Sequence, residues 1–223
     1  MATQLERRNS TRQALLDAAA QCLQEQGVGG FTTVEVVRRS ELSNGALFRY
    51  FPSRSELLAA TVAHIFEKLR FDYERAYSSI PRSQASIQTM LELLWKVMND
   101  PALGSIYEIY TTCRTDLWMR TAIEPVIEEH MARLTELGRE MLESIEGVDP
   151  TYIDEAIQLS VMSIQGLAVH QMAMPSPQQA DKLISSLAWI AEIALGNTGA
   201  GIRESAIDTS EATNQLAGIG ARL

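Results

Sequence analysis

The stretch FTTVEVVRRSELSNGALFRYFPSRSELL, residues 31–58, decides the fold class of this chain. It predicts two short helices joined by a tight turn, then a third helix that starts after a Pro-Ser step. The second of these helices would begin at Ser43, because a serine hydroxyl caps free backbone amides. Small and polar side chains fill its first turn, and arginines flank it. Such a helix is suited to pressing its N-terminal end into a DNA groove.

The charge of the chain is distributed unevenly. The 223 residues carry a net charge of −9, yet residues 1–60 hold seven arginines against six acidic residues, which leaves −10 for the remainder. An acidic body repels DNA everywhere except at the basic end, so this distribution orients the approach to DNA. Two cysteines build neither a disulfide framework nor a four-ligand zinc site.

Beyond the opening stretch, the pattern predicts helices throughout and no strand, so the expected fold class is all-α. Apolar residues recur at three- and four-residue steps, while Gly and Pro mark the boundaries. The expected helices span about 10–26, 32–39, 43–50, 54–78, 84–99, 102–114, 116–146, 150–173 and 178–196. The expected organisation is a helix-turn-helix DNA-binding domain at 1–53, a helical regulatory and dimerisation domain at 54–197, and a flexible tail at 198–223.

An ordered set of motifs extends through residues 31–58. Thr32-Thr33 is followed by the apolar pair Val36-Val37 and a turn, then by Ser-x-Gly-Ala-Leu-aromatic-x-aromatic-Phe from Ser43, and by Pro-Ser-basic-x-x-Leu-Leu from Pro52. In this order the residues resemble the N-terminal signature of the TetR family of bacterial transcriptional repressors, over about residues 8–60. The resemblance implies an N-terminal three-helix DNA-binding domain and a C-terminal helical ligand-binding and dimerisation domain.

Two residues depart from the family pattern. Glu41 stands in the turn where the family usually has glycine, and a left-handed glutamate costs on the order of 1 kcal/mol. Phe48 stands where the family usually has tyrosine, and we expect it to keep the packing and lose one hydroxyl contact. Both departures bear on affinity for the DNA site.

The candidate DNA contacts follow from side-chain chemistry and from the resemblance. Asn44 can bond bidentately to adenine, and Arg49 can reach guanine or a phosphate. The starts of the other helices favour phosphates. The expected contacts are Thr32, Thr33, Ser43, Asn44, Gly45, Ala46, Arg49, Tyr50 and Arg54. Arg7, Arg8 and Arg12 could follow the backbone or enter the minor groove. The alternative is that these arginines are solvated surface of an ordinary helical bundle.

The body is expected to hold a ligand pocket and a dimer interface. Aromatic residues with a few polar groups can line an apolar pocket, and the predicted ligand-binding residues are Trp95, Tyr107, Tyr110, Arg114 and Trp118. The last two helices suit half of a four-helix interface, with predicted contacts at Ile157, Val161, Ile164, Ala168, Leu187, Ile190 and Ala194. The alternative is that these faces only complete the subunit's own core.

The expected function is a homodimeric repressor that a small apolar or amphipathic ligand releases from a palindromic double-stranded operator in the cytoplasm. A second hypothesis has the body respond to a partner protein. An enzyme is not expected, because the sequence holds no nucleophile elbow, phosphate loop, HExxH motif or dinucleotide fingerprint. We expect no catalytic residue, cofactor, metal site or membrane span, since three scattered histidines and short apolar runs support none of them.

Overall fold

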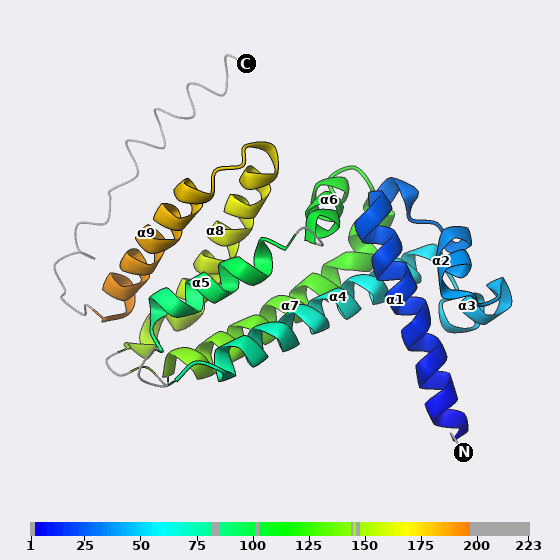
Figure 1. Cartoon of the computed structure of the whole chain (residues 1–223), viewed down its shortest axis with the longest axis horizontal. Helices are drawn as coiled ribbons and strands as arrows, with labels where there is room; N and C mark the ends of the chain where they lie inside the picture. The colour runs from blue at the N-terminus through cyan, green and yellow to red at the C-terminus, as the bar shows by residue number, and fades with distance from the viewer. Residues whose placement is uncertain (1–2, 82–84, 101–102, 144, 146–147, 197–223) are drawn as a thin grey trace, which may run out of the picture.

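The computed structural model describes residues 3–81, 85–100, 103–143, 145 and 148–196, and within these ranges it contains helices and no strand (Figure 1). The all-α expectation is therefore confirmed. The helices are α1 (Gln4–Gly30), α2 (Thr33–Ser40), α3 (Asn44–Tyr50), α4 (Arg54–Ser78), α5 (Ile87–Met98), α6 (Gly104–Thr112), α7 (Leu117–Glu143), the 3-10 helix η3 (Pro150–Tyr152), α8 (Ile153–Ala173) and α9 (Pro177–Gly196). The expected tail at 198–223 lies outside the described residues.

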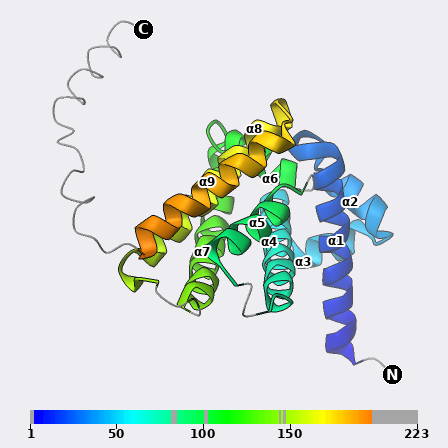
Figure 2. The same ribbon diagram turned by 60° about the vertical axis from the view of Figure 1, so that its left-hand side comes forward.

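The helices form a small head at one end and a longer body. In the head, α2 packs on α1 and on α3, and α1 packs in turn on α4 and α6 (Figure 1). In the body, α4 and α7 run side by side, while α5, α8 and α9 pack on one another at the far end (Figure 2). One continuous set of buried apolar side chains runs through head and body. Movement in the body can therefore reach the head through packed side chains.

The first helix begins earlier than the sequence periodicity predicted. It starts at Gln4 instead of near Ser10, because the Thr3 hydroxyl accepts from the Glu6 N–H at 3.2 Å and the Glu6 carboxylate accepts from the Thr3 N–H at 2.6 Å. This reciprocal pair is a capping box. The residues before Ser10 are polar, so apolar periodicity gave no sign of helix there.

A break interrupts α1 near its end. Gly27 has a φ of 65° and a ψ of −171°, outside the helical region. A Cβ at this position would lie 2.5 Å from a carboxylate oxygen of Glu108, so glycine is required both for the backbone angle and for the close approach. Glu108 in turn accepts from the Val28 N–H at 3.0 Å, which ties α6 to the break.

Side-chain caps set the starts of the head helices. Thr32, Ser43 and Ser53 each accept from the backbone N–H three residues later, as predicted for helix starts. The spacing Thr32-x-x-Glu35 is that of a capping box, but only the Thr32 half forms, because the Glu35 carboxylate bonds to Arg38 and Arg39 instead.

The head has a small apolar core of its own around α3. Leu47, Phe51 and Leu57 are buried and Leu42 is half-buried, and they lock α3 against its neighbours. Phe48, however, is 47% exposed, so the expectation that it keeps the packing is wrong. It lies on the outer side of α3, next in sequence to the buried Leu47.

Candidate nucleic-acid interface and effector cavity

The first turn of α3 faces solvent. Asn44, Gly45 and Arg49 are exposed, and Ser43 caps the helix by accepting from the Ala46 N–H at 3.1 Å. A Cβ at Gly45 would come within 4 Å only of the Ser43 hydroxyl, at 3.9 Å. The fold therefore does not require a glycine there for packing. A missing side chain on an open face leaves room for an outside molecule to approach the backbone closely.

The turn before α3 contains the strained glutamate that the sequence predicted. Glu41 has a φ of 56° and a ψ of 23°, the left-handed conformation, and it is the one non-glycine residue with positive φ in the described part of the chain. The conformation closes α2 and redirects the backbone into α3. Its carboxylate is exposed beside the candidate DNA-contacting turn.

Cations gather where the start of α1 passes α3. Arg7, Arg8, Arg49 and Tyr50 line one open hollow between these two helices. No acidic group in the described residues forms a salt bridge with the three arginines. Because α1 is helical from Gln4, Arg7 and Arg8 are held on a rigid element and not on a loose arm. The hollow therefore presents unneutralised positive charge beside α3, as a phosphate contact requires.

Arg38 and Arg39, in contrast, are neutralised. Arg38 donates to Glu35 at 2.6 Å, and Arg39 donates to Glu35 and to Glu25, each at 2.7 Å. Hydrogen bonds from Arg38 and then Arg39 lower the pKa of Glu35 to about 2. Only some of the basic residues near α3 are therefore free to meet phosphate.

Arg54 is used inside the head. Its Nε donates to the Phe31 carbonyl at 2.9 Å and its Nη2 to the Val28 carbonyl at 3.1 Å. The guanidinium also lies 5.8 Å from the centre of the Phe31 ring. The predicted phosphate contact would compete with these bonds, which join the α1–α2 connection to the start of α4. Thr32 and Thr33 remain at the accessible start of α2.

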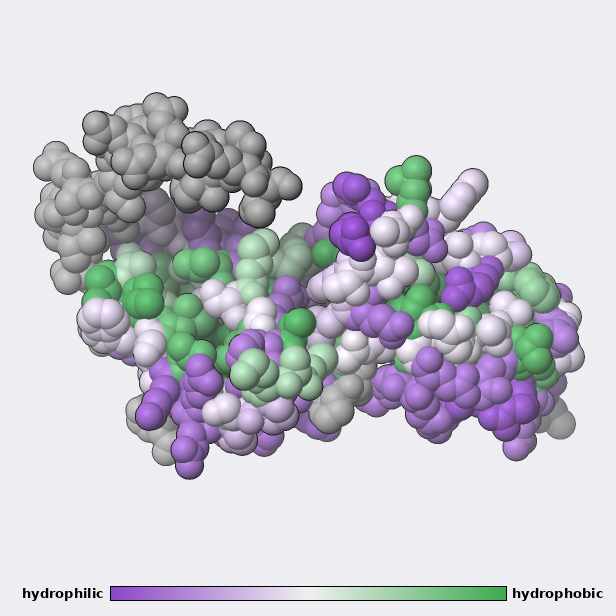
Figure 3. All heavy atoms as spheres, turned by 90° about the horizontal axis from the view of Figure 1, so that it is seen from above, coloured by the Kyte–Doolittle hydropathy of each residue, from purple (hydrophilic) through white to green (hydrophobic). Residues whose placement is uncertain are grey.

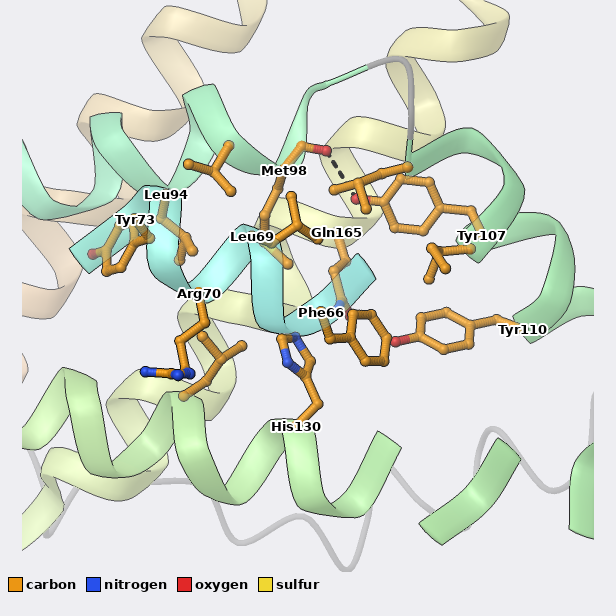
Figure 4. Close-up of a pocket in the computed structure, with 14 residues that line it drawn as sticks. Phe66, Leu69, Arg70, Tyr73, Leu94, Met98, Tyr107, Tyr110, His130 and Gln165 are labelled. Carbon is orange, nitrogen blue, oxygen red and sulfur yellow. Dashed lines mark hydrogen bonds between the residues drawn. The ribbon is translucent and has the colours of Figure 1, made fainter. Parts of the chain in front are cut away.

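The body encloses a cavity between α4, α5, α6, α7 and α8 (Figure 4). Its volume is about 30 Å³. Its lining is mostly apolar, with a few polar groups: Phe66, Leu69, Arg70, Tyr73, Leu94, Val97, Met98, Leu103, Ile106, Tyr107, Tyr110, His130, Leu134 and Gln165.

Two of the five predicted ligand-binding residues line this cavity, Tyr107 and Tyr110 on α6. Trp95 is half-buried against the core but does not line the cavity, and Arg114 lines a separate surface hollow. Trp118 is 85% exposed, so its assignment is wrong. It is the second residue of α7 and lies on the outer side of that turn, whereas the next residue, Met119, is buried.

The sequence interpretation missed other lining residues. Phe66, Leu69 and Tyr73 on α4 could have been found, because they continue the apolar stripe of that helix. Arg70 carried no such signal, since an arginine on a long amphipathic helix is usually solvated.

Burial and hydrogen bonds fix the protonation of the polar side chains in the cavity. The Tyr107 hydroxyl donates to the Met98 carbonyl at 3.0 Å (Figure 4), and burial raises the pKa of Tyr107. Burial also raises the pKa of Tyr110, and a hydrogen bond with Gln165 opposes the rise. The His130 ring stacks on Phe66 with ring centres 3.8 Å apart. Burial, and then the nearby Arg133 charge, lower the pKa of His130 to about 4, so the ring is neutral near pH 7.

The predicted dimer contacts divide into two groups. Ile157, Val161, Ile164 and Ala168 on α8 are at most 8% exposed within a single subunit, so they belong to its own core, which agrees with the alternative interpretation of these faces. On α9, Ile190 and Ala194 are exposed and Leu187 is half-buried. The helical period identified an apolar face on α8, but α5, α6 and α7 cover that face.

A different apolar surface remains open on the same two helices. Figure 3 shows hydrophobic residues gathered over the end of the molecule away from the head. The exposed large apolar residues of α8 and α9, here called the α8–α9 outer face, are Leu159, Met162, Val169, Met172, Leu183, Trp189 and Ile190. Apolar area of this kind commonly marks an interaction surface.

Comparison with known proteins is consistent over the head and over the whole chain. Residues 15–61 match the family model described as bacterial regulatory proteins, tetR family. An uncharacterized HTH-type transcriptional regulator of Mycobacterium tuberculosis is 23% identical over 185 residues, covering 83% of this chain and 94% of that protein. CymR of Pseudomonas putida, an HTH-type transcriptional regulator, is 24% identical over 189 residues, covering 85% and 93%.

The solved structures agree in fold. A putative TetR-family transcriptional regulator from Rhodococcus sp. superposes with a TM-score of 0.63 at 14% identity, covering 82% of this chain and 98% of that one. The family model over the head, the relatives and the solved structures together support a TetR family regulator. This TetR-family protein is a DNA-binding transcriptional regulator, and its relatives are regulators and not enzymes. None of its described helices is long and apolar enough to cross a membrane.

Proposed function

We propose that this regulator is a homodimeric repressor that leaves a palindromic operator when a small apolar or amphipathic ligand fills the cavity of the body. It would act in the cytoplasm, as its DNA target requires. Residues 1–53 would bind DNA and 54–197 would bind the ligand and the second subunit. The observation that carries this proposal is the hydrogen bond from the Val28 N–H, beside the break in α1, to Glu108 on the cavity helix α6.

DNA reading is assigned to the exposed first turn of α3. Asn44 would read a base edge, with Gly45 and Ala46 allowing close approach and Ser43 fixing the helix start. Arg49, together with Arg7 and Arg8, would hold the phosphate backbone. Thr32, Thr33 and Tyr50 lie at the edges of this surface and would add backbone contacts.

Dimerisation is assigned to the α8–α9 outer face. Burying it against a second copy would remove exposed Trp, Met and Leu side chains from water. Two subunits joined there would present two α3 helices to the same side of DNA, about one helical turn or roughly 34 Å apart. That spacing predicts a palindromic operator.

The link from ligand to DNA runs through α6. Tyr107 and Tyr110 line the cavity, while Glu108 between them accepts from the Val28 N–H at 3.0 Å. The carbonyl of the same Val28 accepts from Arg54 at the start of α4. A ligand that moves α6 would therefore shift both α1 and α4. Operator affinity falls if the ligand prefers the arrangement that does not fit DNA.

The dimer is tested by paired tryptophan variants. Trp189 is 62% exposed on the α8–α9 outer face, and Trp118 is 85% exposed at the start of α7. Trp189→Asp should raise the dimer dissociation constant by about 100-fold or more, because it places a charge in an apolar interface. Trp118→Asp is the matched control and should leave sedimentation unchanged. A Trp189→Asp protein that sediments like wild type would remove this face from the proposal.

The switch is tested by fluorescence anisotropy with a labelled duplex that the protein has selected from random DNA. Compounds that raise the unfolding temperature of the free protein are added to the complex. Release of the duplex by a compound that binds the cavity supports the proposal. Tight binders that leave operator affinity unchanged would rule out the ligand-released repressor.

A regulator whose body responds to a partner protein is the second candidate. It is favoured by the adjacent Leu117 and Trp118, which are 72% and 85% exposed. The open cavity favours a small molecule. Loss of regulation in cells carrying Trp118→Asp, with cavity binding intact, would favour the partner protein.

A further inference from the structure

Three side chains separate the inner cavity from the surface. Phe66, Arg70 and His130 line both the cavity and an outer hollow between α4 and α7. The Phe66 and His130 rings stack with an angle of 10° between their planes. Arg70, one helical turn after Phe66, extends from α4 toward α7 (Figure 4). These three residues therefore form one wall of the cavity, and Arg70 is the charged side chain in that wall.

Arg70 has an unused hydrogen-bonding edge in this wall. Its Nη1 donates to the carboxylate of Glu74, one turn further along α4. Its Nε is buried and has no hydrogen-bond partner in the structure, although the side chain as a whole is 27% exposed. A guanidinium stays charged at every physiological pH. A buried N–H of a charged group without a hydrogen-bond partner is unfavourable. A bound acceptor atom would satisfy the Nε–H of Arg70.

The rest of the cavity lining is neutral. Among the described residues that line it, Arg70 is the one that carries a charge near pH 7. His130 is neutral because burial lowers its pKa, and burial raises the pKa of both Tyr107 and Tyr110. The outer hollow differs, since Glu67, Glu129 and Arg133 line it and Arg133 donates to Glu129 at 2.5 Å. Glu74 already pairs with the Nη1 of this guanidinium, so the group left for a ligand is the unpartnered Nε–H, which can donate to a negatively charged acceptor.

Space for a hydrocarbon extends beyond the first cavity. A second cavity of about 50 Å³ shares Tyr73, Leu94 and Leu134 with it. No charged side chain appears in the lining of this second cavity among the described residues. Tyr73, which lines both cavities, follows Arg70 by three residues on α4, so the two side chains leave neighbouring turns of the same helix. This arrangement suits an acid head with an apolar chain.

We propose that the effector is an apolar molecule with one carboxylate, which binds the Nε edge of Arg70 while its hydrocarbon lies in the two adjoining cavities. The inference rests on the proposed function, since it assumes that this cavity is the effector site. Arginine presents two parallel N–H groups along this edge, which matches the two oxygens of a carboxylate. Lysine has no such edge.

The test uses probes that share one chain length and differ in the head group. Decanoate, methyl decanoate and 1-decanol are titrated into the full-length protein by calorimetry, below their aggregation concentrations. Decanoate should bind at least about tenfold more tightly than the ester or the alcohol, because only the carboxylate forms charge-assisted hydrogen bonds. Equal binding of the three probes would overturn the inference.

Variants locate the effect at Arg70. Arg70→Met should remove the preference for decanoate and leave binding of 1-decanol within about threefold of wild type. Arg70→Lys should restore only part of the preference, because it returns the charge without the edge. Arg133→Met removes a cation from the outer hollow and is the matched control, which should keep the full preference. If Arg70→Met does not fold, the preference of the wild-type protein for decanoate, compared with that of Arg70→Lys, still tests whether Arg70 binds the carboxylate.

The outcomes separate this inference from the proposed function. Decanoate that binds through Arg70 but leaves operator affinity unchanged supports the carboxylate site and contradicts the ligand-released repressor. Release of the operator by 1-decanol as effective as by decanoate, and undiminished in Arg70→Met, contradicts the carboxylate site and leaves the repressor intact. Failure of all three probes to bind would overturn the carboxylate site.

Discussion

At the residue scale, the head separates arginines that hold the fold from arginines that are open to DNA. Arg38, Arg39 and Arg54 are bonded to carboxylates or carbonyls within the head. Arg49 lines the same open hollow as Arg7 and Arg8, at the edge of the recognition helix. This division decides which substitutions should alter DNA affinity and which should alter stability.

Alanine variants of Asn44 and Arg49 should therefore weaken DNA binding in different ways. Asn44→Ala should cost about 1–3 kcal/mol on the selected operator and little on random duplex, because it removes a base contact. Arg49→Ala should weaken both DNAs and lower the salt slope by about one, because it removes a phosphate contact. Anisotropy titrations at several salt concentrations measure both effects. Arg38→Ala is the control, and a loss as large as that of Arg49→Ala would contradict the division.

His130 should make stability depend on pH. Its pKa in the folded protein is about 4, below the ordinary value of 6.5, because burial disfavours the charged ring. The unfolded chain then binds the proton first, so stability is fully present above about pH 6.5 and is lost as the pH falls toward 4. The loss is on the order of 3 kcal/mol at most.

Urea unfolding at pH 7.5 and at pH 5 measures this effect. His130→Phe keeps a ring against Phe66 and has no proton to bind, so it should flatten the dependence. An unchanged pH dependence in His130→Phe would show that other groups cause it.

At the element scale, the sequence predicted the helix positions better than it predicted which face of each helix is buried. Apolar periodicity with Gly and Pro breaks located every helix after α1 to within a few residues, because period and punctuation are local properties. The start of α1 lay in a polar segment, where only the Thr3–Glu6 capping pair signals a helix.

Which face is buried depends on neighbouring helices. The apolar face of α8 at Ile157 and Val161 belongs to the core because α5 and α7 cover it, and in the first turn of α7 Met119 is buried while Trp118 is exposed. Tertiary neighbours of this kind are not encoded in a single helix, which is also why Arg70 could not be predicted as a cavity residue.

The turn between α2 and α3 gives a prediction about strain. Glu41→Gly should stabilise the protein by about 0.5–1 kcal/mol, because glycine adopts the left-handed conformation without a Cβ clash. Glu41→Ala keeps the clash and should bring no gain. Both remove a negative charge beside α3 and should tighten DNA binding at low salt.

Chemical denaturation and anisotropy measure the two effects of these variants. Equal stability of the Gly and Ala variants would contradict the assignment of strain to Glu41.

At the scale of the whole molecule, the cavity and the head are joined through α6. Glu108→Ala should free the Val28 amide, and hydrogen exchange in the segment around Gly27 should speed up by about fivefold, since one such partly buried hydrogen bond contributes roughly 1 kcal/mol. Mass spectrometry of that segment measures the change. Glu108→Gln keeps an acceptor oxygen and should retain most of the protection. Unchanged exchange in Glu108→Ala would mean that α6 does not hold the head.

The most direct measurement is in vitro selection of bound DNA from a random duplex library, with the purified full-length protein at near-physiological salt. Because two α3 helices of one dimer would lie about one DNA turn apart, we predict enrichment of a palindrome whose half-sites are about 10 base pairs apart, centre to centre. Enrichment of a single unrepeated half-site, or of no sequence at all at low and moderate salt, would contradict the dimeric operator-binding regulator.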